Sequence, residues 1–200
     1  VMQCTKDVDY APFYDAVAQR QMPYDAHIIG NHEFDFEPGV LKKFIEGFEI
    51  NGVLQQPFLS ANLDFSEQQD PSFDALLDSD NLVIPPITDG RVLARAAIIT
   101  DRHTGQRFGI VGMSPTYLET ISSPEDVIVL DNVAELVQEQ IDRIQNDYGV
   151  NKILFVSHLQ SLENDKELIP QLSGIDVVVA GGGDEQIGRA SCRERVCHRV

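Results

Sequence analysis

The amino-acid sequence predicts a layered α/β domain, because segments with helical periodicity alternate along the chain with short apolar runs typical of strands. The chain has 200 residues, of which 42% are hydrophobic and 24% are charged. This length and composition suit one globular domain with its own core. We find no internal repeat, coiled-coil pattern or low-complexity tract that would favour another architecture.

Helices are expected where apolar residues recur at spacings of three and four. Residues 10–21 and 38–48 show this pattern, and Asn132 is expected to cap a third, strongly amphipathic helix that ends near Gly149. A short further helix is expected between the last two strands.

Strands are expected where short runs rich in apolar and β-branched residues occur. These runs are residues 26–29, 58–63, 92–100, 108–113, 152–156 and 176–180. Residues 92–100 and 108–113 flank a loop at residues 101–105 and should pair as a hairpin, whereas residues 152–156 and 176–180 suit strands covered on both faces. Residues 64–82 have no clear period and are expected to form a surface excursion.

The charge of the chain excludes some classes of partner. Its formal net charge is -17 and its sequence pI is near 4.4, which argues against binding to a nucleic-acid backbone or an anionic membrane. A small phosphorylated substrate remains compatible, because a bound divalent cation can reverse the sign of the charge locally. The sequence shows neither a targeting signal nor an apolar run long enough for a membrane-spanning helix.

The last residues differ in composition from the rest. Residues 188–200 read GRASCRERVCHRV, with four arginines, one glutamate and no apolar periodicity. We expect residues 1–187 to form the domain and residues 188–200 to be translated vector sequence, the alternative being a short basic tail that binds a partner. Two of the three cysteines lie in this tail, so no disulfide framework is visible.

The most informative segment follows the expected strand at residues 26–29. It presents an amide, Asn31, an imidazole, His32, and the carboxylates Glu33 and Asp35 within a few residues. Asn31 can offer a carbonyl oxygen to a hard cation, and His32 can donate a proton if Asp35 orients its ring. The alternative is a capped turn with a surface histidine.

Two further strand ends carry potential ligands. His158 follows the strand at residues 152–156, and the glycine turn after residues 176–180 leads into Asp184 and Glu185. Each alone could be a plain structural turn, but a common edge of one sheet would bring all three segments together. His27, His103 and His198 are interpreted as bystanders.

The order of these motifs resembles that of a known family. Residues 30–35 (GNHEFD), 60–62 (SAN), 109–112 (GIVG), 157–158 (SH) and 181–182 (GG) occur as they do in 5′-nucleotidases of the calcineurin-like metallophosphoesterase superfamily. The similarity spans about residues 10–185, and GNHEFD is its most specific string.

This resemblance implies a four-layer αββα sandwich with two divalent metals at the carboxyl ends of its strands. It implies that Asn31 and His158 are metal ligands and that His32 and Asp35 are the catalytic pair. The implied reaction is hydrolysis of a nucleotide phosphoester by a metal-activated water, with Mn, Mg or Zn as cofactor. The family also suggests a periplasmic or extracellular location. The alternatives are a phosphodiesterase on the same scaffold and a domain that binds without turnover.

The sequence departs from the family in two places. Members open with an Asp-x-His strand and a Gly-Asp turn that do not occur here, so the sandwich is expected to be incomplete at its amino-terminal end. Gly183 and Glu185 stand where the family has His-x-His or His-x-Gln, so Asp184 or Glu185 would serve as oxygen ligands and favour Mn or Mg. We therefore expect this chain to bind metal weakly or not at all, to be nearly inactive, and to be able to form a homodimer through an exposed sheet edge.

Overall fold

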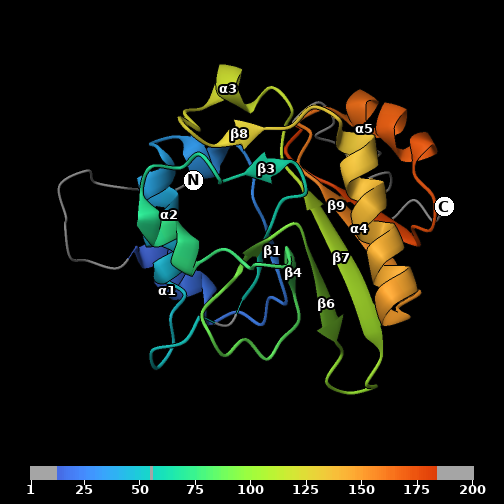
Figure 1. Cartoon of the computed structure of the whole chain (residues 1–200), viewed down its shortest axis with the longest axis horizontal. Coiled ribbons are helices and arrows are strands. Elements are labelled where there is room, and N and C mark those ends of the chain that lie inside the picture. Colours follow the sequence, from blue (N-terminus) through green and yellow to red (C-terminus); the bar gives the residue numbers. More distant parts are fainter. Residues whose placement is uncertain (1–12, 55, 184–200) are drawn as a thin grey trace, which may run out of the picture.

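The computed structural model describes residues 13–54 and 56–183 (Figure 1). Asp184, Glu185 and the expected tail at residues 188–200 lie outside the described residues. The helices are α1 (Tyr14–Gln19), α2 (Pro38–Glu46), α3 (Leu118–Ile121), α4 (Val133–Tyr148) and α5 (Leu162–Leu168), with 3-10 turns η1 (His32–Phe34), η2 (Pro71–Ala75) and η3 (Ile169–Gln171). The strands are β1 (His27–Ile28), β2 (Phe58–Leu59), β3 (Leu63–Asp64), β4 (Leu82–Val83), β5 (Leu93–Ala94), β6 (Ala96–Thr100), β7 (Arg107–Met113), β8 (Ile128–Val129), β9 (Ile153–Ser157) and β10 (Val177–Ala180).

The strands form two main sheets. The first is parallel with the order β1-β2-β5, and the second has the order β10-β9-β7-β6-β4. In the second sheet β6 runs antiparallel to β7, and the other neighbours are parallel. The short strands β3 and β8 pair separately as an antiparallel ribbon. The carboxyl ends of β1, β2, β7 and β9 are therefore the ends at which a site can be built.

Three apolar clusters show how the layers stack. The first joins α2 to the outer face of the β1-β2-β5 sheet through residues such as Phe44, Phe58 and Leu93. The second lies between the two sheets and includes Leu59 and Ala97. The third joins α4 and α5 to the far face of the second sheet through residues that include Val111, Val137, Ile141, Phe155 and Leu168.

The order of layers is therefore helix, sheet, sheet, helix. Figure 1 shows α1 and α2 on one side of the molecule and α4 and α5 on the other. The expected α/β fold, a four-layer αββα sandwich, is confirmed.

Gly112 lies where β7 packs closely against the first sheet. An added Cβ at this position would lie 2.7 Å from the backbone oxygen of Leu59 and 2.9 Å from Cδ1 of Ile28. Both contacts are too short for a real Cβ atom, so the absence of a side chain at residue 112 permits this spacing between β7 and the first sheet.

The helix α4 forms as the periodicity predicted. Its apolar residues Leu136, Val137, Ile141 and Ile144 are buried, and Gly149 ends it in the left-handed conformation with φ of 65°. Asn132 occupies the N-cap position, but its side chain makes no capping hydrogen bond and donates instead to Glu135 at 3.2 Å. The prediction of the helix was right, and the proposed side-chain cap was wrong.

Three expected elements differ in the structure. Residues 58–63 do not form one strand, because β2 ends at Leu59 and β3 begins at Leu63 in a different sheet. Residues 92–100 also divide, since β5 pairs with β2 while β6 pairs with β7, and the chain crosses between the sheets at Arg95. The helix expected over residues 10–21 is described only at Tyr14–Gln19.

The segment of residues 64–82 is more than a surface excursion. It contains η2, and its side chains Phe65, Phe73 and Leu76 are buried in the cluster that also holds α2. The rings of Phe65 and Phe73 stack with centroids 5.6 Å apart. Apolar residues without a regular period can still pack when a short 3-10 turn brings them to one side.

Within the described residues, we find no helix whose length and apolar character would allow it to cross a membrane.

Candidate functional site

The candidate site lies where strands of both sheets end. Asn31 follows β1, Ser60 follows β2, Ser114 follows β7 and His158 follows β9. Within the second sheet, His158 N donates to Met113 O at 2.8 Å, and between the two sheets Ala61 N donates to Gly112 O at 2.8 Å.

A buried hydrogen-bond network fixes the sheets relative to each other beneath this rim. Asn62 is fully buried; its Oδ1 accepts from Ser60 Oγ at 3.1 Å and from Ser114 N at 3.0 Å, and its Nδ2 donates to Ser114 O at 3.2 Å. Ser114 Oγ donates to the carbonyl oxygen of Ile29 at 2.6 Å. The network therefore ties the strand end that precedes Asn31 to β2 and β7.

Asn31 and His158 contact each other directly. His158 Nε2 lies 3.1 Å from Asn31 Oδ1, and the amide Nε2 of Gln160 also donates to Asn31 Oδ1. The backbone of Asn31 is held as well, because Ser122 Oγ donates to its carbonyl oxygen at 2.7 Å. Asn31 is buried, and His158 and Gln160 are half-buried. The side chains of His158 and Gln160 thus contact the same oxygen atom of Asn31.

Two glycines make room for the ring of His158. A Cβ added at Gly30 would lie 2.7 Å from Nε2 of His158, and one added at Gly182 would lie 2.9 Å from its Cδ2. Gly182 also has φ of 86°, which side chains rarely adopt. The glycines on either side of the site therefore position the imidazole and leave little space for it to move.

The protonation state of His158 suits a ligand. Burial is the main cause that lowers the pKa of His158 below its ordinary value of 6.5, and the positive charge that His32 can carry lowers it further. At neutral pH the ring is therefore neutral and has one nitrogen lone pair. A neutral imidazole is the form that binds a metal ion.

The spacing of the two atoms fits a shared cation. Adjacent ligands lie about 3.0 Å apart around an octahedral ion and about 3.4 Å apart around a tetrahedral one, given bonds of about 2.1 Å. The 3.1 Å between Asn31 Oδ1 and His158 Nε2 falls in this range. Among the described residues, however, no group of three or more His, Cys, Asp or Glu side chains could hold a metal ion. The described part of the chain thus offers two neutral donors at a suitable spacing.

His32 and Asp35 form a hydrogen-bonded pair next to Asn31. His32 Nδ1 lies 2.9 Å from Asp35 Oδ2, and the side chains are 61% and 35% exposed. The buried ring of Phe34 anchors the turn η1, which carries His32, and Ser123 N donates to the carbonyl oxygen of Phe34 at 2.9 Å. When Nδ1 donates to Asp35, Nε2 remains available to a molecule in solvent.

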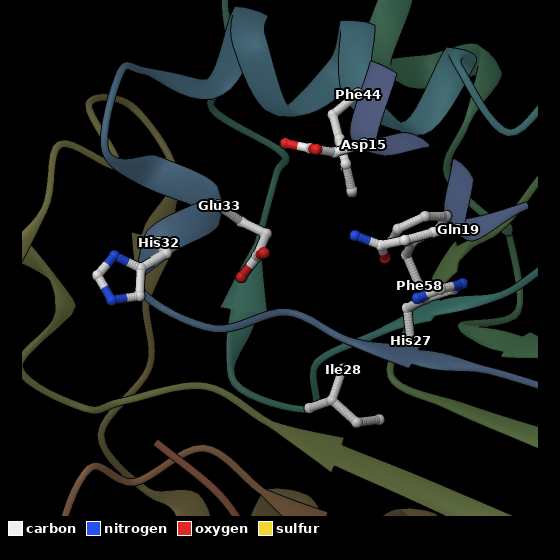
Figure 2. A pocket seen from close by; sticks show the side chains of 8 residues that line it. All are labelled: Asp15, Gln19, His27, Ile28, His32, Glu33, Phe44 and Phe58. Carbon is white, nitrogen blue, oxygen red and sulfur yellow. The ribbon is translucent and has the colours of Figure 1, made fainter. Parts of the chain in front are cut away.

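Glu33 projects from the same turn into a neighbouring cavity of about 320 Å³ (Figure 2). Its Oε2 accepts the backbone N–H of Gly30 at 2.7 Å, and burial raises the pKa of this carboxyl group above its usual range. Figure 2 shows His32 and Glu33 pointing in different directions from η1, with His27 and Phe58 lining the other side of the cavity. Glu33 therefore holds the backbone of Gly30, against which His158 rests.

The structure brings together four of the six expected site residues, namely Asn31, His32, Asp35 and His158. Asp184 and Glu185 lie outside the described residues. His27 stacks on Phe58 with ring centroids 4.7 Å apart, and His103 lies in the exposed loop between β6 and β7.

Sequence reasoning missed Gln160, Ser122 and the part played by Glu33. Glu33 stood in the GNHEFD string and could have been suspected. Gln160 and Ser122 carried no signal, because their contacts with Asn31 join residues far apart in the sequence.

The fold and the position of the site define a class of protein. A four-layer αββα sandwich with polar residues at the carboxyl ends of strands in both sheets is the architecture of metallophosphoesterase domains, to which the resemblance pointed.

Comparisons with known proteins agree with this class. No family model matches the chain. The chain is 30% identical over 183 residues to a probable 5′-nucleotidase of Treponema pallidum (strain Nichols), covering 88% of this chain and 26% of that protein. It is 29% identical over 179 residues to the trifunctional nucleotide phosphoesterase protein YfkN of Bacillus subtilis (strain 168), covering 84% of this chain and 12% of that protein.

A solved structure gives the same result. The crystal structure of a 5′-nucleotidase precursor from Thermus thermophilus matches with a TM-score of 0.66 and 29% identity, covering 84% of this chain and 28% of the other. The chain thus spans about a quarter or less of the length of these relatives. Over the part that they cover, the chain is a homologue of proteins named 5′-nucleotidase and shares their fold.

Proposed function

We propose that the protein containing this chain is a metal-dependent phosphoester hydrolase that releases phosphate from a nucleotide. The observation that carries the proposal is the contact between Asn31 and His158 beside the His32–Asp35 pair. A neutral oxygen, a neutral nitrogen and a hydrogen-bonded imidazole lie at one rim, where a phosphate group could reach all of them.

Asn31 Oδ1 and His158 Nε2 would hold a divalent cation in this proposal. A cation bound there would polarise a phosphoryl oxygen and increase the acidity of a water molecule. Two such cations are expected in the intact enzyme, with Mn, Mg or Zn as candidates. Asp184 and Glu185, which lie outside the described residues, remain proposed as further oxygen ligands.

His32 would act on the phosphoryl group through Nε2. It would donate a hydrogen bond to the charge that develops on the phosphoryl oxygens, or a proton to the leaving oxygen. Asp35 would position the ring and stabilise its protonated form. Because both side chains are accessible to solvent, a substrate can reach them without movement of the core.

The substrate class comes from the relatives, whose names include 5′-nucleotidase and nucleotide phosphoesterase. We propose a small phosphorylated substrate, most simply a nucleoside monophosphate, and not a nucleic acid. The net charge of -17 would repel a polyanion over most of the surface, whereas one phosphate needs only a local cation. A periplasmic or extracellular location stays a prediction from the family.

Two other functions remain as competing proposals, a phosphodiesterase on the same scaffold and a domain that binds nucleotides without turnover. Phosphate release from AMP and hydrolysis of bis(p-nitrophenyl) phosphate should be measured with Mn²⁺ and with EDTA, using the complete gene product that contains these residues. Metal-dependent release from AMP supports the nucleotidase. Hydrolysis of the diester alone supports the phosphodiesterase. AMP binding without either product supports the binding domain.

We further propose that the 200-residue chain alone binds metal weakly and is nearly inactive. Asn31 and His158 are neutral, and the described residues offer no cluster of three His, Cys, Asp or Glu side chains to neutralise a pair of cations. Calorimetric titration with Mn²⁺ tests this point, and tight binding at two sites would refute it.

A further inference from the structure

Gln160 has an unusual backbone conformation for its residue type. It follows β9 by three residues and has φ of 64°, in the left-handed region that favours glycine. Glycine would adopt this φ without strain, whereas glutamine adopts it at an energetic cost. The contacts of the long amide side chain are therefore the place to look for a function.

The side chain of Gln160 is directed into the candidate site. Its Nε2 donates to Asn31 Oδ1, which is also the atom nearest to His158 Nε2. Its Cδ lies 3.3 Å from the position that a Cβ on Gly182 would take, so the amide packs against the same glycine as the ring of His158. Three side chains thus place polar atoms around one point, and two of them are already proposed as ligands.

Given the proposed function, on which this step rests, we infer that Gln160 supplies a third neutral ligand, its Oε1, to the cation that Asn31 and His158 hold. A primary amide carries a donor and an acceptor of nearly the same shape, and rotation about the Cγ–Cδ bond exchanges them. Without a cation the NH₂ group faces the oxygen of Asn31. With a cation the carbonyl oxygen faces the same point.

A third ligand of this kind also affects the choice of metal. Two amide oxygens and one imidazole form a harder donor set than histidine and cysteine would provide. Compared with a site made of softer ligands, this donor set favours Mn²⁺ or Mg²⁺ over Zn²⁺. Gln160 is therefore a residue that sets metal affinity and metal preference.

Binding of Mn²⁺ to the 200-residue chain tests the inference without any need for activity. The free Mn²⁺ signal in electron paramagnetic resonance measures binding even when it is weak. Gln160→Gly, which suits the positive φ, should weaken Mn²⁺ binding by about tenfold, by analogy with losses on removing groups that support a metal. Gln160→Asn should also weaken it, because the amide becomes one methylene too short, whereas Gln160→Glu should strengthen it.

Asn51→Gly is the matched control. Asn51 is exposed, has φ of 54° and lies outside the site, so this change tests the effect of glycine at a positive-φ position alone. Its Mn²⁺ affinity should equal that of the parent chain. Thermal unfolding followed by circular dichroism confirms that each variant is folded.

The outcomes separate the inference from the function on which it rests. Unchanged or tighter Mn²⁺ binding in Gln160→Gly would overturn the inference, since tighter binding means that the amide competes with the cation. If the 200-residue chain with His158→Ala binds Mn²⁺ as well as the parent chain does, the cation site itself is wrong and both proposals fall. Loss in His158→Ala without loss in Gln160→Gly overturns the role of Gln160 alone.

Discussion

His158 Nε2 lies 3.1 Å from Asn31 Oδ1, although 127 positions separate the two residues in the sequence. Their contact joins the end of β1, in the parallel sheet, to the end of β9, in the mixed sheet. It therefore depends on the packing of the two sheets and on the glycines that let the ring of His158 fit between them.

Gly30→Ala should disturb this contact. The new Cβ would lie 2.7 Å from Nε2 of His158, so the ring must move away from Asn31. We expect Mn²⁺ affinity to fall by about tenfold or more, as is found when the groups that position a metal ligand are lost. Gly39→Ala is the control, since an added Cβ at Gly39 meets nothing within 4 Å. Equal Mn²⁺ affinities of the two variants would show that the fit of His158 against Gly30 does not matter.

His32→Ala should lower turnover of AMP by about 10² or more in the complete gene product, the range expected for loss of a general acid. KM should change little, because the proposed hydrogen bond or proton transfer acts mainly in the transition state. Asp35→Asn should have a smaller effect in the same direction, since it removes the charge but can keep contact with Nδ1. Steady-state kinetics separate kcat from KM, and near-normal kcat in both variants would remove His32 and Asp35 from the mechanism.

Asn62→Ala should destabilise the fold by about 1–3 kcal/mol, because it removes the side chain that pairs with the buried backbone N–H and carbonyl oxygen of Ser114. Urea unfolding followed by circular dichroism measures the change. Asn132→Ala is a suitable control, since Asn132 is exposed and its side chain makes no capping bond. A loss no larger than that of the control would mean that the network does not hold the sheets together.

His27 should make stability depend on pH. Burial lowers the pKa of His27 below its ordinary value of 6.5, although the hydrogen bond with Gln56 acts in the opposite direction. The unfolded chain takes up a proton as the pH falls through about 6.5, before the folded chain does. Protonation of His27 in the unfolded chain therefore lowers the free energy of unfolding as pH falls from 6.5 to the lower pKa of the folded chain. At higher pH this effect is absent.

Replacement of the ring isolates this effect. As pH falls from 7.5 to 5.5, the free energy of unfolding of the parent should decrease relative to that of His27→Phe. His103→Phe, in an exposed loop, controls for removal of a histidine as such. A difference that stays constant with pH would contradict the assignment to His27.

The spacing of apolar residues along the sequence predicted those helices and strands that bury a regular set of side chains. The apolar face of α4 and the apolar run of β9 were readable because each buries a regular set of side chains in one cluster. The sequence did not predict that residues 58–63 divide between two strands. The chain leaves β2 where Asn62 forms its buried hydrogen bonds with Ser60 and Ser114, and these contacts depend on tertiary packing. Arg95 likewise marks a crossing between sheets that only tertiary packing defines.

The same distinction applies to the candidate site. Asn31 and His158 could be placed together because residues that follow the carboxyl ends of strands meet at one rim. His32 and Asp35 could be paired because three residues separate them in one turn. Gln160 could not be found, since its contact with Asn31 depends on a positive φ that glutamine rarely adopts.

The location of a bound metal tests the central claim most directly. Crystals grown with Mn²⁺ should be measured by anomalous diffraction, using a form of the protein that hydrolyses AMP. The account predicts an anomalous peak at bonding distance, about 2.0–2.4 Å, from both Asn31 Oδ1 and His158 Nε2. Strong Mn²⁺ peaks elsewhere in an active crystal, with none shared by Asn31 and His158, would contradict it.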